Sequence, residues 1–157
     1  MEYYEDIKPH QKHRSREYYL SEEEIVDYAK KWDPQPFHID PEHAKNTVFG
    51  GLVASGAHLY AILMKLENEK RPRPAWITVL GLDKIRFLSA ARPGDVLVLE
   101  DEVISKRESK SNSNAGIVHS AGKLINQQGE IVLTVEGIAM LEKRPANGTP
   151  SSQSSAR

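Results

Sequence analysis

Residues 32–40 read Trp-Asp-Pro-Gln-Pro-Phe-His-Ile-Asp and bring an acid and an imidazole close together in the chain. Asp33 and His38 are five residues apart, and the two prolines between them prevent a continuous helix. The segment must follow a stiff, extended or turned path that can present both side chains to one cleft. A carboxylate beside an imidazole can activate water and deliver a proton. The structural alternative is that Asp33 ends a helix and His38 packs on a loop.

A second motif leads into the most apolar stretch of the chain. Residues 49–56 read Phe-Gly-Gly-Leu-Val-Ala-Ser-Gly, and the run from Leu52 to Leu66 is almost wholly apolar or small. The N-terminus of a helix offers unpaired N–H groups and a partial positive charge, and glycine lets a substrate oxygen come close. These features suit the stabilisation of an oxyanion or enolate. The alternative is that the small residues only allow tight packing of a helix against a sheet.

Two other combinations of reactive residues are disfavoured. Asp33, His38 and His43 could be imagined as metal ligands, but the proline-rich path and the lack of helical histidine spacing argue against a metal site. Ser55 and His58 could form a nucleophile and base. They lie three residues apart on one expected helix, and the Gly-x-Ser-x-Gly pattern is absent.

The first half of the chain is expected to be helical. Ser21 and Glu24 form a capping box, and this helix must stop at residues 32–33 because prolines follow. Asp40, followed by proline, predicts the start of one short helical turn. Apolar residues spaced by three and four positions predict a third helix over residues 52–66, buried on most sides.

The second half of the chain is expected to form strands. They are predicted over residues 76–87, 96–106, 116–126 and 131–141. Asn-Gln-Gln-Gly-Glu at residues 126–130 indicates a hairpin. Residues 105–114 are expected to be a solvated loop, whose Lys106, Arg107 and Lys110 could alternatively meet a nucleotide phosphate. Long antiparallel strands and one apolar helix predict an α+β domain in which the sheet wraps the helix.

Composition limits the possible classes of function. The 157 residues include 21 basic and 22 acidic side chains, so no net positive field favours nucleic acid. There is no cysteine, which excludes disulfides and zinc-thiolate sites. No apolar run of membrane-spanning length and no secretory signal is visible, so we expect no membrane association and a cytoplasmic location. We expect an N-terminal extension over 1–14, one domain over 15–143 and a disordered tail over 144–157.

The two motifs together resemble those of the MaoC-like family of (R)-specific enoyl-CoA hydratases and acyl dehydratases. The resemblance rests on residues 33–41 and 49–58 and extends to residues 82–87, 92–95 and 126–130. It implies a single hotdog domain, a curved antiparallel sheet wrapped around a buried central helix. It also implies the addition of water to a trans-2-enoyl-CoA to give an (R)-3-hydroxyacyl-CoA. The CoA thioester would be the substrate, with no cofactor and no metal.

The resemblance implies a role for individual residues. Asp33 would take a proton from water as the water attacks Cβ, and His38 would supply the proton to Cα. The backbone N–H of Gly56 would bind the thioester oxygen and stabilise the enolate-like charge. The residues expected to contact the substrate are Trp32, Gln35, Phe37, Phe49 and Ser55.

Three positions depart from the family pattern. Trp32 replaces the usual glycine and could narrow the pocket. Gln35 replaces the usual asparagine and could displace the loop that carries the dyad of Asp33 and His38. Met64 aligns with a serine that supports the site in some hydratases. These departures bear on which class of substrate is bound and on the reaction rate, more than on the presence of the dyad itself.

Two other functions are open on sequence grounds. A hotdog thioesterase would use a carboxylate and helix N-terminal amides, although the Asp-x4-His spacing favours hydration. A non-catalytic acyl-CoA-binding subunit would be consistent with the substitutions at Trp32 and Gln35. One sheet around one helix leaves an open edge that a second copy can pair with, so we expect a homodimer or a dimer of dimers.

Overall fold

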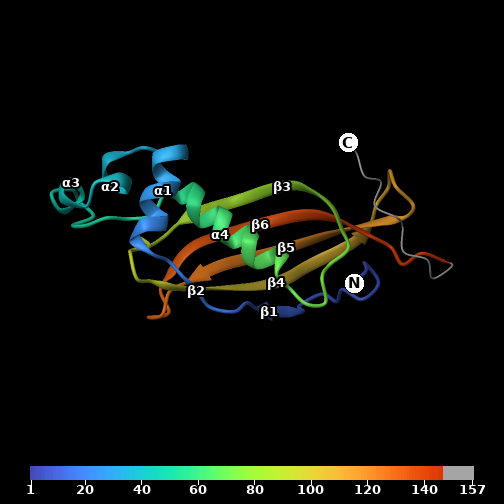
Figure 1. The fold of residues 1–157 in the computed structure, drawn as a ribbon. Coiled ribbons are helices and arrows are strands. Elements are labelled where there is room, and N and C mark those ends of the chain that lie inside the picture. Colours follow the sequence, from blue (N-terminus) through green and yellow to red (C-terminus); the bar gives the residue numbers. More distant parts are fainter. Residues whose placement is uncertain (147–157) are drawn as a thin grey trace.

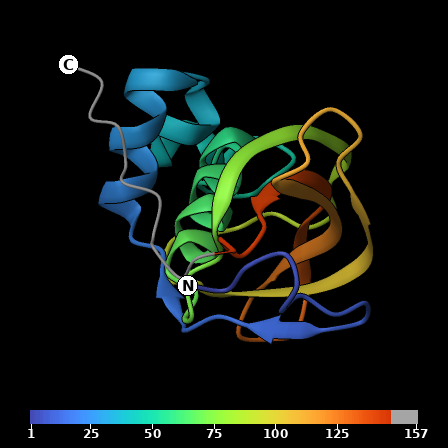
Figure 2. The ribbon, with the colours of Figure 1, turned by 90° about the vertical axis from the view of Figure 1, so that its right-hand side faces the viewer.

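Four long antiparallel strands form most of the sheet. They are β3 (Trp76–Phe87), β4 (Val96–Glu108), β5 (Ala115–Ile125) and β6 (Ile131–Glu142). Two short N-terminal strands, β1 (Lys12–Arg14) and β2 (Tyr18–Tyr19), both pair with β4, and the order across the sheet is β1-β4-β5-β6-β3. The sheet curves around one helix, α4 (Gly56–Asn68), as Figures 1 and 2 show. The predicted α+β architecture, a curved antiparallel sheet around a central helix, is confirmed.

The computed structural model describes residues 1–146, and most of the predicted tail over 144–157 lies outside the described residues. The first 14 residues, expected to be an extension, contribute β1 to the sheet. Tyr4 and Ile7 are buried in a small cluster with Val103 of β4. Within residues 1–146, no helix is both long and apolar enough to cross a membrane.

Strand β4 continues to Glu108, so the strand predicted over residues 96–106 is confirmed, and the overlapping prediction of a solvated loop is wrong over residues 105–108. The ammonium group of Lys106 donates to the carbonyl oxygens of Tyr4 at 2.8 Å and Ile7 at 2.7 Å. It also lies 4.3 Å from the centre of the Tyr4 ring. Lys106 therefore anchors the N-terminal segment, an interaction across about a hundred residues that local sequence does not reveal.

Helix α4 begins at Gly56 and not at residue 52, which corrects the predicted start. Ser55 is the N-cap residue, and its hydroxyl accepts a hydrogen bond from the backbone N–H of Ala57 at 3.2 Å. The residues before it stay extended because their N–H groups bond to other segments: Val53 to the carbonyl of Phe37 and Ala54 to that of Ala91. Its apolar side chains fill the core beneath the sheet, including Leu59, Ile62, Leu63 and Leu66.

Three further helices precede α4: α1 (Glu22–Trp32), α2 (Pro36–Ile39) and α3 (Pro41–Lys45). Ser21 caps α1 as predicted, accepting from the N–H of Glu24 at 3.1 Å. Asp40 caps α3 as predicted, with its Oδ1 accepting from the next two free N–H groups. The segment between α1 and α3 is bonded to the residues just before α4, because the N–H of Val53 donates to the carbonyl of Phe37.

A partly buried polar network holds α1 against α4. The hydroxyl of Tyr18 donates to Glu24 Oε1 at 2.5 Å, and His58 Nε2 lies 2.9 Å from the same oxygen. The His58 ring stacks on Tyr28 with ring centres 4.3 Å apart. This contact fixes the start of α4 relative to the body of α1.

The network predicts a dependence of stability on alkaline pH. Burial, and then the hydrogen bond to Glu24, raise the pKa of the Tyr18 phenol to about 12 from 10.0. The folded state therefore holds this proton more tightly than the unfolded state does. The resulting stabilisation is present below pH 10 and is lost as the pH rises from 10 toward 12.

Tyr18→Phe is expected to lower the free energy of unfolding by about 1 kcal/mol at a pH well below 10. In the alkaline window the difference from wild type should shrink, because wild type alone loses the contribution of Tyr18. Urea unfolding of both proteins, at a pH well below 10 and at a pH between 10 and 12, measures this difference in the free energy of unfolding. Tyr19→Phe is the matched control, since Tyr19 is 65% exposed. An unchanged difference across the window would contradict the prediction.

Candidate active site

The end of α1 and the short helix α2 position the acid and the imidazole. Asp33 is the C-cap of α1, and its N–H still bonds to the carbonyl of Ala29 at 2.9 Å. The chain then turns, with the N–H of Gln35 bonded to the carbonyl of Asp33 at 2.8 Å. Pro36 begins α2, which carries His38. The proline-rich segment is therefore turned, and it brings both side chains to one place.

The two side chains face each other at close range. His38 Nε2 lies 3.6 Å from Asp33 Oδ2, beyond a normal direct hydrogen bond. His38 Nδ1 lies 2.7 Å from the carbonyl oxygen of Val53, which can only accept, so Nδ1 carries a proton. The remaining ring nitrogen, Nε2, is thereby directed at the acid. His38 is buried, whereas about a third of the Asp33 side chain stays exposed.

Ser55 connects the acid to the central helix. Its hydroxyl donates to Asp33 Oδ2 at 2.7 Å and accepts from the N–H of Ala57. Ser55 is only 1% exposed, so its hydroxyl contacts the acid and not an open cleft. Direct contact between Ser55 and substrate stays a prediction. The same carboxylate oxygen thus faces both Ser55 and His38, while Oδ1 accepts no hydrogen bond from the described residues.

Gly56 is the first residue of α4, and an aromatic ring covers it. A Cβ placed on Gly56 would lie 2.6 Å from the Cζ of Phe87, so the ring packs directly on the glycine. The Gly56 N–H has no hydrogen-bond acceptor among the described residues, as expected for the first turn of a helix. Phe87 is 56% exposed, so its ring has room to move aside.

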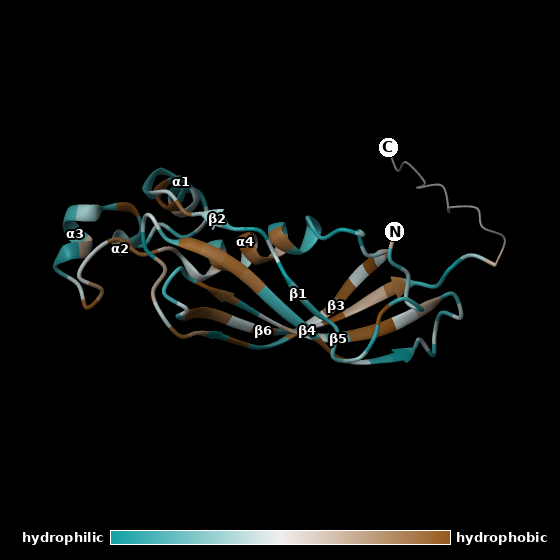
Figure 3. Cartoon of the chain, turned by 90° about the horizontal axis from the view of Figure 1, so that it is seen from below, coloured by the Kyte–Doolittle hydropathy of each residue, from teal (hydrophilic) through white to brown (hydrophobic). Residues whose placement is uncertain are grey.

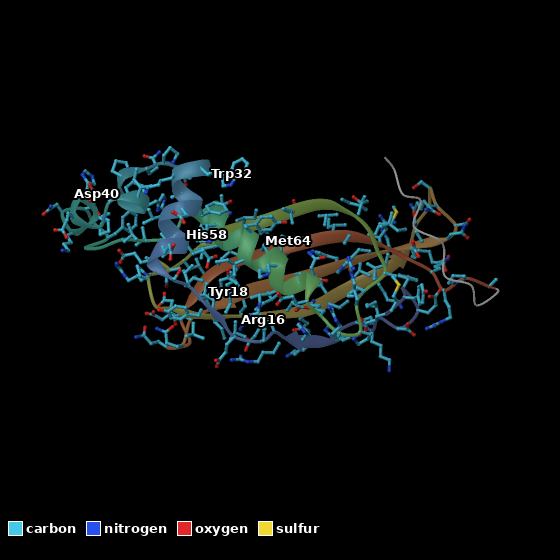
Figure 4. All side chains as sticks on the ribbon, viewed as in Figure 1. Arg16, Tyr18, Trp32, Asp40, His58 and Met64 are labelled. Carbon is cyan, nitrogen blue, oxygen red and sulfur yellow. The ribbon has the colours of Figure 1, made fainter. Side chains whose placement is uncertain are left out.

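The other residues predicted to contact substrate fall into two groups. Phe37 is half-buried, with its ring 4.5 Å from that of His38 and 5.1 Å from that of Phe49, so these three rings form one wall. Trp32 is 64% exposed at the end of α1 (Figure 4), and the ammonium of Lys31 lies 4.9 Å from the centre of its ring. A surface position does not support the expectation that Trp32 narrows the pocket.

Gln35 is also exposed, and Asp33 and His38 lie within reach of each other on either side of it. Contact of Trp32 and Gln35 with substrate stays a prediction. Sequence reasoning missed Val53, whose carbonyl holds the imidazole, and Phe87, which covers Gly56. Neither carries a local signal, since one contributes only its backbone and the other lies on a distant strand.

An apolar cavity of about 210 Å³ lies between α4 and the strands β3 and β6, and Asp33, His38 and Gly56 do not line it. Met64, at the position where some hydratases have a serine, lies on α4 (Figure 4) and lines this cavity. Ser55 supplies the hydroxyl bonded to Asp33 in this chain. Other apolar side chains that line the cavity are Leu63, Val79, Leu82, Val135 and Ile138.

Comparison with known proteins assigns the class. The family described as "MaoC like domain" matches residues 6–122, more than half of the chain. The chain therefore belongs to the MaoC-like dehydratase family, whose members include hydratases and dehydratases of acyl thioesters.

Solved structures and curated sequences agree with this assignment. A MaoC-like dehydratase from Rhodospirillum rubrum is 31% identical, with a TM-score of 0.84 over 91% of this chain and 98% of that one. The R-hydratase PhaJ1 from Pseudomonas aeruginosa is 26% identical, with a TM-score of 0.75 over 90% and 86% of the two chains. These matches confirm the hotdog fold.

The 3-hydroxyacyl-[acyl-carrier-protein] dehydratase FabZ of Caldicellulosiruptor bescii is 31% identical over 85 residues, which are 54% of this chain and 58% of that enzyme. The chain spans less than two thirds of the length of the curated relatives it matches, 66% and 58%.

Proposed function

We propose that this protein is an enoyl-CoA hydratase that adds water to a trans-2-enoyl-CoA and forms an (R)-3-hydroxyacyl-CoA. The observation that carries the proposal is the approach of His38 Nε2 to the Asp33 carboxylate, 3.6 Å apart beside the N-terminus of α4. The likeness to a solved protein named as an R-hydratase supports it. The reverse reaction, dehydration, uses the same groups.

The geometry supports a sequence of proton movements that balances. The Asp33 carboxylate takes a proton from a water molecule while the water oxygen bonds to Cβ of the substrate. Electrons of the double bond move to the thioester oxygen, where the N–H of Gly56 and the helix dipole stabilise the negative charge. His38, protonated on both nitrogens, gives the proton on Nε2 to Cα. The proton on Asp33 then returns to His38 across the short gap between them.

The assay uses crotonyl-CoA, a short enoyl thioester. The expected result is loss of the ultraviolet absorbance of the enoyl thioester with no release of free thiol. Thiol release without loss of the enoyl absorbance would identify a thioesterase instead. If neither signal appears with enoyl-CoAs of several chain lengths, the proposal is wrong and the result favours a non-catalytic acyl-CoA-binding subunit.

Ser55 is a positioning residue in this proposal, because it acts on substrate only through Asp33. Ser55→Ala is expected to lower kcat about tenfold and to change KM little, since the acid loses one hydrogen bond that fixes its orientation. Ser55→Thr keeps the hydroxyl and should restore most of kcat.

Both Ser55 variants are compared with Ser21→Ala, which removes the N-cap of α1 in the same way. Each alanine variant should lose about 1 kcal/mol of stability. Only Ser55→Ala should lose activity in the crotonyl-CoA assay. Equal activity of the two alanine variants would show that Ser55 serves the helix alone.

We further propose that two copies pair along the free edge of β3. This strand ends the sheet and exposes apolar residues along its length, and exposed edges of this kind favour pairing with another chain. The exposed side chains are Ile77, Val79, Leu80, Leu82 and Phe87 of β3, and Leu88 directly after it. A dimer of such dimers, and the cytoplasmic location, stay predictions.

Leu80→Glu is expected to convert a dimer into a monomer, because a carboxylate at the seam would be desolvated without a partner. Light scattering after size-exclusion chromatography should give about twice the 17.7 kDa chain mass for wild type and the single mass for the variant. Val48→Glu is the matched control, since Val48 is 98% exposed outside β3. A monomeric wild type, or a dimeric Leu80→Glu variant, would refute pairing at this edge.

A further inference from the structure

Helix α1 is attached to the start of α4 at two separate places. At the C-terminal end of α1, Asp33 accepts the hydrogen bond of Ser55, the N-cap of α4, at 2.7 Å. Near the N-terminal end of α1, Glu24 Oε1 lies 2.9 Å from Nε2 of His58, in the first turn of α4 (Figure 4). Figures 1 and 2 show α1 beside the start of α4. The two attachments are about 13 Å apart along the axis of α1.

His58 is 3% exposed, and two residues of α1 hold its ring. The carboxylate of Glu24 accepts, so His58 Nε2 carries the proton of their hydrogen bond. The ring of Tyr28 lies flat on the imidazole, with an angle of 7° between the two planes. Nδ1 has no hydrogen-bond partner among residues 1–146, so a proton on it would be buried without an acceptor. The imidazole is therefore neutral, and α1 fixes it by one hydrogen bond and one ring contact.

Packing alone does not explain a histidine at this position of α4. Figure 3 shows that the helix is mainly hydrophobic and becomes hydrophilic at its C-terminal end. The next buried residues, Leu59 and Ile62, are apolar. An apolar side chain at position 58 would fill the core without leaving a buried nitrogen unpaired. What an apolar residue could not supply is the hydrogen bond to Glu24.

The orientation of α1 determines where the acid lies. Asp33 belongs to α1 and the N–H of Gly56 to α4, so the distance between the two groups depends on how one helix is set against the other. Ile25 and Ala29 bury one face of α1, but apolar contacts have no preferred direction. The hydrogen bond of Ser55 fixes one point, about which α1 could still turn. A second fixed point about 13 Å away prevents that turn.

We propose that Glu24 and His58 are positioning residues, which hold the Asp33 carboxylate at its working distance from the N–H of Gly56. This role rests on the proposed function, in which the acid and the N–H act on one substrate at the same time. An active site needs its groups within about 0.5 Å of the productive geometry. Both residues act through Asp33 and neither contacts the substrate.

The first test removes the carboxylate of Glu24. Glu24→Ala is expected to lower kcat for crotonyl-CoA about tenfold and to change KM little, because the acid is misplaced while the rest of the site is kept. Glu24→Gln keeps an oxygen that can accept from His58 and should restore most of kcat. Glu23→Ala is the matched control, since Glu23 has the same charge and is exposed on the same turn of α1. His58→Phe keeps a ring but loses the hydrogen bond, so it should lose kcat as Glu24→Ala does.

Two further variants separate positioning from stability. Tyr18→Phe removes the other hydrogen bond to Glu24 Oε1 but leaves α1 attached to α4, so it should lose stability and keep kcat. In an Asp33→Asn background, Glu24→Ala should not lower the residual rate further, because its effect passes through the missing carboxylate. Three results would overturn the proposal: a wild-type kcat in Glu24→Ala, an equal loss of kcat in Tyr18→Phe, or a further tenfold loss in the Asp33→Asn background.

A measurement that does not depend on the reaction completes the test. In crystal structures of the wild type and of Glu24→Ala, we expect the Asp33 carboxylate to differ in its position relative to the Gly56 nitrogen by about 0.5 Å or more. An unmoved carboxylate overturns the positioning role even if the protein hydrates crotonyl-CoA. A moved carboxylate in a protein that hydrates no enoyl-CoA supports the two-point attachment and overturns only the proposed reaction.

Discussion

Asp33→Asn is expected to lower kcat for crotonyl-CoA hydration by about a thousandfold, within the range that a single general base contributes. Asparagine has the shape of aspartate, and its amide oxygen can still accept the hydrogen bond of Ser55. It cannot take a proton from water, however. The loss should therefore fall on kcat, with KM changed only a few-fold, and the unfolding temperature should stay close to that of wild type.

The control for this variant lies in the same segment. Asp40→Asn makes the same chemical change at an exposed N-cap, where asparagine caps as well as aspartate does. Its activity should remain near that of wild type. If Asp33→Asn kept more than about a tenth of the wild-type rate, the carboxylate would not be the base.

His38→Asn is expected to lower the rate by at least a hundredfold while preserving the fold. The amide nitrogen of asparagine can take the place of Nδ1 and donate to the carbonyl of Val53, so the anchor is kept. No atom replaces Nε2, which faces Asp33 and would supply the proton to Cα. The variant therefore separates the reactive nitrogen from the structural one.

His43→Asn, an exposed histidine of α3, is the matched control and should retain full activity. Circular dichroism and the unfolding temperature check that both variants fold. Near-normal hydration by His38→Asn would leave the imidazole with a packing role only. If activity is lost while both of these measurements stay normal, binding of butyryl-CoA checks that the site itself is still formed.

Local sequence predicted the elements well where their ends depend on nearby residues. The capping hydroxyl of Ser21 and the prolines after Asp33 fix α1 from within their own neighbourhood. The start of α4 was predicted four residues too early, because residues 52–55 continue the apolar run of the helix. Their N–H groups bond instead to residues far along the chain, such as Ala91, and no periodicity within the run records those partners.

The candidate site was likewise predictable from sequence only where its residues lie close together in the chain. Asp33 and His38 lie on one short segment, so their spacing alone indicated that they could meet. The contact between Ser55 and Asp33 joins residues 22 positions apart, and that between Gly56 and Phe87 depends on how β3 lies along α4. Such contacts follow from the packing of elements and are visible only once the whole fold is known.

The imidazole of His38 is oriented by a main-chain oxygen, that of Val53. Every amino acid carries that oxygen, so no exchange of the side chain at this position deletes the anchor chemically. The side chain at position 53 therefore affects only how well the apolar core packs. The orientation of the histidine depends on the path of the peptide backbone. Substitutions at position 53 would keep the hydrogen bond to His38 as long as the backbone path is unchanged.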